Sequence, residues 1–133
     1  MAIESIYLLD TNVIVELLRG NPIIREKIQS IGLSRCFISE ITIAELTYGA
    51  INSGITEELN DVDTITKLFQ IIPIAQTFTE YGHIRTSLRK EGLLVDQFDM
   101  LIAATALHYS LVVVTHNRKH FQRIPSLSIE DWQ

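Results

Sequence analysis

The chain has 133 residues, of which 47% are hydrophobic and 20% are charged. These proportions exclude a disordered chain, and the length suits one domain, residues 1–133, better than two. No apolar run approaches the ~20 residues that a membrane helix needs, and the N-terminus, which carries Glu4, is unlike a signal peptide. The only cysteine, Cys36, excludes an internal disulfide, and we expect it to be a small buried hydrophobe in a reducing cytoplasm.

The net charge of −5 argues against a protein that coats nucleic acid by bulk electrostatics. The charge is unevenly distributed, because residues 36–82 contain seven acids and a single base, Lys67. The bases after residue 83 form two groups: Arg85, Arg89 and Lys90, then Arg118, Lys119 and Arg123. Either group could meet a phosphate backbone or could simply be a solvated surface.

Short apolar runs rich in β-branched residues predict strands, and more polar stretches with helical periodicity lie between them. The strands are expected at residues 5–9, 36–39, 70–74 and 111–115, and the helices at 11–21, 22–32, 40–52, 56–69, 77–92 and 96–110. This alternation predicts an α/β domain with a mostly parallel central sheet flanked by helices. In such a sheet, functional groups gather at the carboxyl ends of the strands.

Asp10 stands at the carboxyl end of the first predicted strand, in the sequence "LDTN". One interpretation is that Asp10 or Thr11 caps the following helix, a common use of both residue types. The other is that Asp10 holds a metal ion. The two roles are compatible if different oxygens of the carboxylate serve them.

Glu45 is the only charged residue between Glu40 and Glu57, and apolar sequence surrounds it on both sides. Such a helix is normally buried, and an unpaired buried carboxylate must be protonated, paired or metal-bound. No basic residue lies within a helical turn of Glu45 to neutralise it.

Asp99 is similarly isolated, because the next formal charge along the chain is Arg118. The small residues of "MLIAATAL" predict a closely packed helix, which "DQFD" could begin with Asp96 as its cap. If Asp10, Glu45 and Asp99 share one site, their repulsion requires a cation. Oxygen ligands select Mg²⁺ or Mn²⁺, the ions commonly used to hydrolyse phosphodiesters.

Four segments carry a resemblance to a known family: "LLDTNVIVELLRG", "SEITIAELTYGA", "DMLIAATAL" and "LVVVTHNRKHFQRI". Their order and spacing resemble those of PIN-domain ribonucleases, specifically the VapC-type toxins of bacterial toxin–antitoxin pairs, and the closing "IEDW" is similar as well. The resemblance implies a PIN fold and Mg²⁺- or Mn²⁺-dependent hydrolysis of RNA by a metal-activated water. It also implies a cognate antitoxin and a homodimeric state.

By position, the resemblance makes Asp10, Glu45 and Asp99 the catalytic and metal-binding acids. It makes Thr11 and Asn12 supporting residues that help fix the site. Thr115 matches a threonine or serine that often lies near the metal.

The sequence departs from the family after the strand ending in "VVVT", where many relatives have a fourth acid and this chain has "HNRKHF". Asn117 could supply an amide oxygen there, and Asp96 could compensate, although helix capping suits Asp96 better. A second metal ion is therefore in doubt. The residues proposed to contact RNA are Arg85, Arg118, Lys119 and His116, with His120 as a further phosphate or metal-water contact.

Three other classes of protein also place an aspartate after a first strand or share the PIN fold. A haloacid-dehalogenase-like phosphotransferase needs a second aspartate where Asn12 stands, and a receiver domain needs an acidic pair that is missing. A degenerate PIN domain that binds RNA or antitoxin without cleaving is the stronger alternative, because the fourth acid is absent. The apolar surroundings of Glu45 favour the enzyme.

Overall fold

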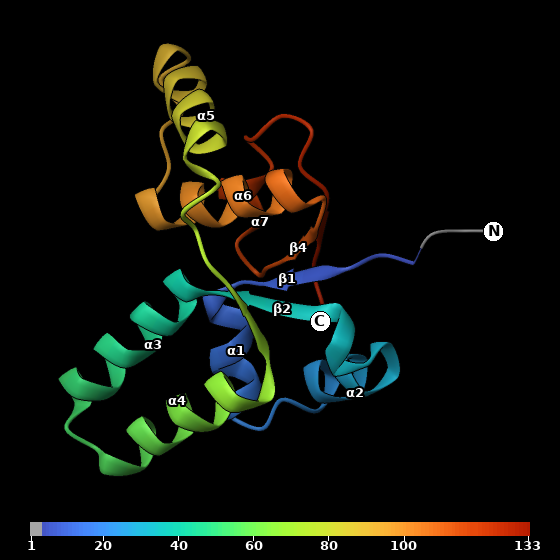
Figure 1. Cartoon of the computed structure of the whole chain (residues 1–133), viewed down its shortest axis with the longest axis vertical. Helices are drawn as coiled ribbons and strands as arrows, with labels where there is room; N and C mark the ends of the chain where they lie inside the picture. Colours follow the sequence, from blue (N-terminus) through green and yellow to red (C-terminus); the bar gives the residue numbers. More distant parts are fainter. Residues whose placement is uncertain (1–3) are drawn as a thin grey trace.

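A computed structural model describes residues 4–133, in which a five-stranded sheet lies between two layers of helices (Figure 1). The strand order is β3-β2-β1-β4-β5, and every neighbouring pair is parallel. This confirms the predicted α/β class. The strands are β1 (Tyr7–Leu9), β2 (Cys36–Ser39), β3 (Gln70–Ile72), β4 (Val112–Val114) and β5 (Ile129–Glu130).

All six predicted helices are present, with ends that differ by at most a few residues from the expected ones. Three short elements were not predicted, namely β5, a four-residue helix and a 3₁₀ turn, because such short runs have no periodicity to detect. The helices are α1 (Thr11–Leu18), α2 (Pro22–Ile31), η1 (Leu33–Arg35), α3 (Glu40–Ser53), α4 (Thr56–Leu68), α5 (Phe78–Lys90), α6 (Gln97–Tyr109) and α7 (Arg118–Phe121).

The two faces of the sheet bury separate apolar clusters. Tyr7 and Leu9 of β1 face the cluster formed with α1 to α4, whereas Leu8 faces the cluster formed with α5 to α7. Successive side chains of a strand point to opposite faces, so both layers of helices are held by the same short strand. Figure 1 shows α1 to α4 on one side of the sheet and α5 to α7 on the other. Cys36 is free and fully buried, as predicted.

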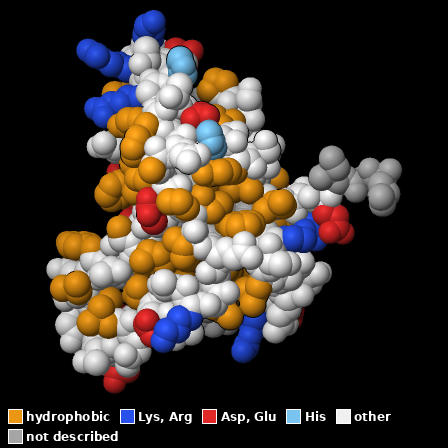
Figure 2. Space-filling model, viewed as in Figure 1, with side chains coloured by type: hydrophobic (Ala, Val, Ile, Leu, Met, Phe, Trp, Pro, Cys, Tyr) orange, Lys and Arg blue, Asp and Glu red, His pale blue; other side chains and the backbone are white. Residues whose placement is uncertain are grey.

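The prediction that α3 is buried is wrong for its second half. Tyr48 and Ile51 are 70% and 65% exposed, whereas Ile41 and Leu46 nearer the start are buried. The reason is that α3 extends beyond the sheet and forms an arm with α4 (Figure 1), so only part of its surface is covered. Figure 2 shows hydrophobic side chains on the surface over this arm. In contrast, α6 is closely packed as predicted, with Ala103 and Ala104 fully buried.

Within residues 4–133, none of the helices combines the length and the apolar character that crossing a membrane would require.

Candidate active site

Asp10 follows β1 directly, and its side chain is only 4% exposed. Its Oδ1 accepts a hydrogen bond from the Thr11 backbone N–H at 2.8 Å, and its Oδ2 accepts one from the Thr115 hydroxyl at 2.8 Å. One oxygen thus caps α1 while the other faces the end of β4. Burial raises the pKa of Asp10 to about 6; the two hydrogen bonds oppose this rise, and the charges of Asp99 and Glu45 add to it.

Glu45 projects from the first half of α3 and is partly buried. Its Oε1 accepts a hydrogen bond from the Thr11 hydroxyl at 2.7 Å, and the Thr42 hydroxyl lies 3.0 Å from that same Thr11 oxygen. Because Thr11 gives its only hydroxyl proton to Glu45, Thr42 must donate to Thr11. Burial raises the pKa of Glu45, and the nearby charge of Asp99 adds to that effect. The Glu45 carboxylate is therefore bonded to the hydroxyl of Thr11 and not to a basic side chain.

Asp99 lies in the first turn of α6 and contacts the segment after β4. Its Oδ2 is 3.1 Å from His120 Nδ1 and 3.5 Å from Asn117 Nδ2, and these two nitrogens are 2.8 Å apart. Burial raises the pKa of Asp99, and the hydrogen bond from His120 opposes this rise. Where the family resemblance leads us to expect a fourth acid, this chain therefore places an amide and an imidazole against Asp99.

The three acids come from different parts of the chain and are electrostatically linked, because the charges of Asp99 and Glu45 raise the pKa of Asp10 and the charge of Asp99 raises the pKa of Glu45. As they stand, no three His, Cys, Asp or Glu side chains of residues 4–133 are close enough together to hold a metal ion. Each acid is instead hydrogen-bonded to a neighbouring side chain. The donor set nevertheless fits a hard divalent cation, because it consists of carboxylates whose ionised form is disfavoured until a positive charge approaches.

Two other predicted supporting residues, Asn12 and Asp96, bond to the backbone near the acids. Asn12 Oδ1 accepts a 3.4 Å hydrogen bond from the backbone N–H of His116, which ties the start of α1 to the end of β4. Asp96 is exposed and accepts hydrogen bonds from the N–H groups of Phe98 and Asp99 at 2.9 and 3.4 Å. The capping interpretation of Asp96 is therefore confirmed.

The predicted RNA-contacting residues have different surroundings. Arg118 and Lys119 are exposed in the first turn of α7, directly after the segment that carries Asn117. Arg85 is exposed on α5 and donates a hydrogen bond to the hydroxyl of Tyr81 at 2.7 Å. Their contact with RNA remains a prediction.

His116, also predicted to contact RNA, has a protein partner that was not predicted, Asp131. Its Nδ1 lies 2.7 Å from Asp131 Oδ1. The sequence does not predict a role for Asp131, although it lies in "IEDW". The reason is that Asp131 meets His116 only when β5 lies beside β4. Thr42 was also missed, and its position one helical turn before Glu45 is the signal that could have identified it.

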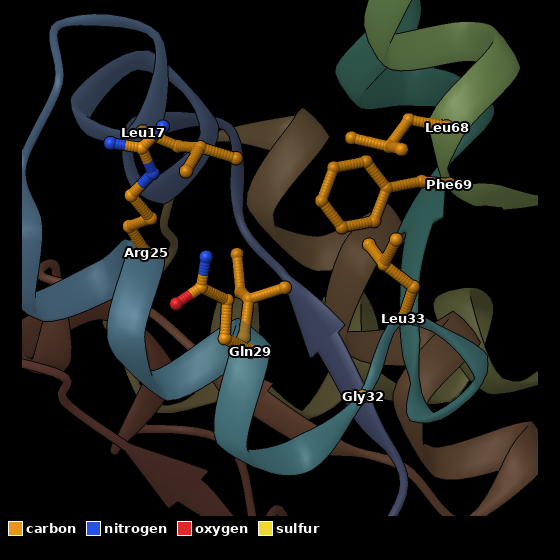
Figure 3. A pocket seen from close by; sticks show the side chains of 8 residues that line it. Leu17, Arg25, Gln29, Gly32, Leu33, Leu68 and Phe69 are labelled. Atoms are coloured by element: carbon orange, nitrogen blue, oxygen red, sulfur yellow. The ribbon is translucent and has the colours of Figure 1, made fainter.

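Three cavities lie near α1, and two of them differ clearly in their relation to the acids. One of about 430 Å³ reaches Thr11 and Glu45. The other, of about 410 Å³, lies between α1, α2 and the end of α4 and contains none of the three acids. Figure 3 shows Leu33, Leu68 and Phe69 together on one side of it. Its mainly apolar lining does not suit phosphate chemistry.

Thr115→Val is expected to lower the affinity for Mn²⁺ by about 10- to 100-fold, because outer groups that orient a ligand typically have effects of this size. Thr115 is fully buried, and valine preserves its shape while removing the hydroxyl bonded to Asp10. The measurement is Mn²⁺ titration by calorimetry. Thr105→Val is the matched control, since that buried threonine bonds only to its own helix at Leu101. Equal losses in both variants would contradict the assigned role of Thr115.

The parallel sheet has helices on both faces, with Asp10 directly after its central strand and Glu45 and Asp99 on α3 and α6, and this arrangement is that of the PIN-domain class. Residues 7–127 match the PIN domain family. The chain therefore belongs to the PIN-domain family, and its relatives place it among the VapC-type members. Ribonuclease VapC1 of Haemophilus influenzae is 37% identical to it over 131 residues, covering 96% of this chain and 98% of that protein. The tRNA(fMet)-specific endonuclease VapC of Salmonella typhimurium is 37% identical over 129 residues, covering 95% and 97%.

Solved structures agree with this placement. VapBC2 from Rickettsia felis, bound to a DNA fragment from its promoter, has a chain that superposes with a TM-score of 0.89 at 32% identity, covering 96% of this chain and 99% of that one. DNA-bound VapBC from Salmonella typhimurium also gives a TM-score of 0.89, at 36% identity, covering 98% and 100%. The PIN fold implied by the sequence resemblance is thus confirmed.

Proposed function

We propose that this protein is the ribonuclease toxin of a toxin–antitoxin pair and hydrolyses RNA phosphodiester bonds at Asp10, Glu45 and Asp99 with the help of a divalent metal ion. The observation that carries the proposal is the set of three half-buried or buried carboxylates, from three different elements, whose neighbours are hydroxyl, amide and imidazole groups. The likeness to VapC ribonucleases supports RNA as the substrate.

The three acids would hold Mg²⁺ or Mn²⁺. When bound, such an ion polarises a phosphoryl oxygen and lowers the pKa of a coordinated water. The chain's own hydroxyls contribute orientation: Thr115 fixes one oxygen of Asp10, and Thr11 fixes one oxygen of Glu45. Side chains held in this way keep the acids in place before substrate arrives.

A PIN domain that binds RNA without cleaving it is the second candidate, favoured by Asn117 and His120 at the place of a fourth acid. The cluster argues against it, because a binding module gains nothing from carboxylates that raise one another's pKa and repel phosphate.

Incubation of tRNA with the protein in Mg²⁺, Mn²⁺ or EDTA separates these candidates. A tRNA is the first substrate to test, because one relative is named as a tRNA(fMet)-specific endonuclease. We expect cleavage with either metal, none in EDTA, and recovery when excess metal is restored. Binding of RNA without cleavage in either metal would favour the second candidate.

We also propose that the protein acts in the cytoplasm, binds a cognate antitoxin and forms a homodimer. The solved relatives that support a partner are VapBC complexes. The free, buried Cys36, whose pKa burial raises to about 11, suits a reducing compartment. The exposed Tyr48 and Ile51 of α3 offer apolar surface to a second copy.

Arg118→Glu is expected to weaken RNA binding by about tenfold and to reduce the salt dependence of binding by roughly one phosphate contact, because Arg118 is exposed beside the acid cluster. The measurement is RNA affinity at several salt concentrations, with Mn²⁺ affinity measured alongside. Arg89→Glu makes the same charge change on the exposed end of α5 and serves as the control. The assignment of Arg118 fails if both variants bind RNA equally well.

A further inference from the structure

A cavity of about 590 Å³ adjoins the acid cluster on the side of α1 that faces α2, and no function has yet been given to it. Asn12 and His116 both line it, and they are joined by the hydrogen bond from the His116 N–H to Asn12 Oδ1. The residues just before them, Thr11 and Thr115, contact Glu45 and Asp10. The cavity therefore lies next to the acids, because two of the residues that line it directly follow the residues that contact Glu45 and Asp10.

The polar side chains that line the cavity each have one atom fixed by the protein and another left to meet a ligand. Asn21 Oδ1 accepts the N–H groups that begin α2, which leaves its Nδ2 as a donor. Asn12 uses its Oδ1 on His116 and likewise keeps its Nδ2. Asp131 holds His116 by Nδ1 at 2.7 Å and leaves Nε2, while Gln133 donates its Nε2 to Asp131 at 3.3 Å and leaves its Oε1 as an acceptor.

The charges of the lining argue against a phosphate. Arg19 is paired with Glu16 at 3.2 Å, and His116 is paired with Asp131. A phosphate entering here would meet the Glu16 carboxylate, which lines the cavity, and the His116 imidazole already has a carboxylate partner in Asp131. The amide and imidazole groups instead resemble those that read the edges of nucleobases, and Val15 and Ile23 add apolar wall.

We propose that this cavity receives one unpaired nucleobase of the RNA, next to the scissile phosphate. Asn12, Asn21 and His116 contact the edge of the base, and Asp131 is a positioning residue that turns His116 toward it. The volume lies within the ~300–1,000 Å³ typical of sites for small ligands. This inference rests on the proposed function and adds a source of sequence preference to it.

The test is cleavage of single-stranded RNAs that are randomised around the cut site, with relative kcat/KM measured for each base at each position. We expect the wild type to prefer one base at one position beside the cut. His116→Ala should reduce that preference by about tenfold, because a good base contact discriminates by this factor or more. Asp131→Asn should reduce it by a smaller factor, while the Mn²⁺ concentration for half-maximal rate stays unchanged.

Ile23→Trp is a second variant that fills the cavity from a partly exposed position and should flatten the same preference. His83→Ala, on the exposed surface of α5, is the control and should keep it. A uniform fall in rate with the preference intact would overturn the inference and leave the cavity to another partner, such as a protein. Cleavage by the wild type with no preference beside the cut would also overturn it, whereas no cleavage of any RNA would overturn the proposed function itself.

Discussion

Replacing Asp99 by asparagine is expected to lower the rate of RNA cleavage by about 10³-fold, which corresponds to about 4 kcal/mol of transition-state stabilisation. The substitution removes a negative charge from the three-acid cluster but keeps a side chain that His120 can contact. The measurement is kcat on a defined RNA, together with Mn²⁺ affinity, which we expect to fall in parallel.

Asp63→Asn is the matched control for this result. It makes the same chemical change at an exposed carboxylate of α4, whose partner is Lys67 at 2.8 Å. We expect its activity to remain within about twofold of the wild type, since exposed ion pairs contribute little. If Asp99→Asn cleaved RNA at a rate similar to that of Asp63→Asn, the three-acid mechanism would be wrong.

The metal-free protein is expected to become more stable as the pH falls from 7.5 to about 5. The pKa of Asp10 is about 6 in the folded state, against an ordinary value of 3.8. Between pH 3.8 and pH 6 the Asp10 carboxyl keeps its proton in the folded chain but has lost it in the unfolded chain. The folded state is therefore fully destabilised above about pH 6, and this destabilisation decreases as the pH falls below 6. The full effect corresponds to about 3 kcal/mol of unfolding free energy and is reached only when the pH falls below about 4, so about half of it is expected between pH 7.5 and pH 5.

Thermal unfolding in EDTA at several pH values measures this effect, and Asp10→Asn isolates it from the titration of other groups. Asparagine caps helices as well as aspartate does, so α1 should remain intact. We expect the difference between the two proteins to shrink at pH 5 and widen at pH 7.5, and Mn²⁺ at pH 7.5 should stabilise the wild type more than the variant. Parallel pH profiles would show that Asp10 does not carry the effect.

Much of the fold could be predicted because the chain alternates clear signals. The apolar runs at residues 36–39 and 111–115 became buried parallel strands, and the expected boundary between two helices at residues 21 and 22 is present, where Asn21 caps α2 instead of ending α1. The exposure of Tyr48 could not be predicted, because it depends on how far α3 extends beyond the sheet rather than on its own apolar composition.

The candidate site likewise has features that the sequence predicts and features that only the fold shows. The isolation of Glu45 from any base was visible in the sequence and is matched by its hydroxyl partner, Thr11. The sequence allows the two oxygens of Asp10 to have different roles, but only the fold shows that one caps α1 and the other accepts from Thr115. The pairing of His116 with Asp131 depends on the register of a two-residue strand, which leaves no pattern in the sequence.

Because β1 is the middle strand of the sheet, the acids can assemble only after β1 has paired on both sides. This strand pairs with β2 at Cys36 and with β4 at Val112, so its closure joins segments that are about a hundred residues apart. Asp10 meets Thr115 only when this long loop has closed. The α1 to α4 layer alone would lack an assembled acid cluster, so nuclease activity on refolding should recover no earlier than the pairing of β1 with β4.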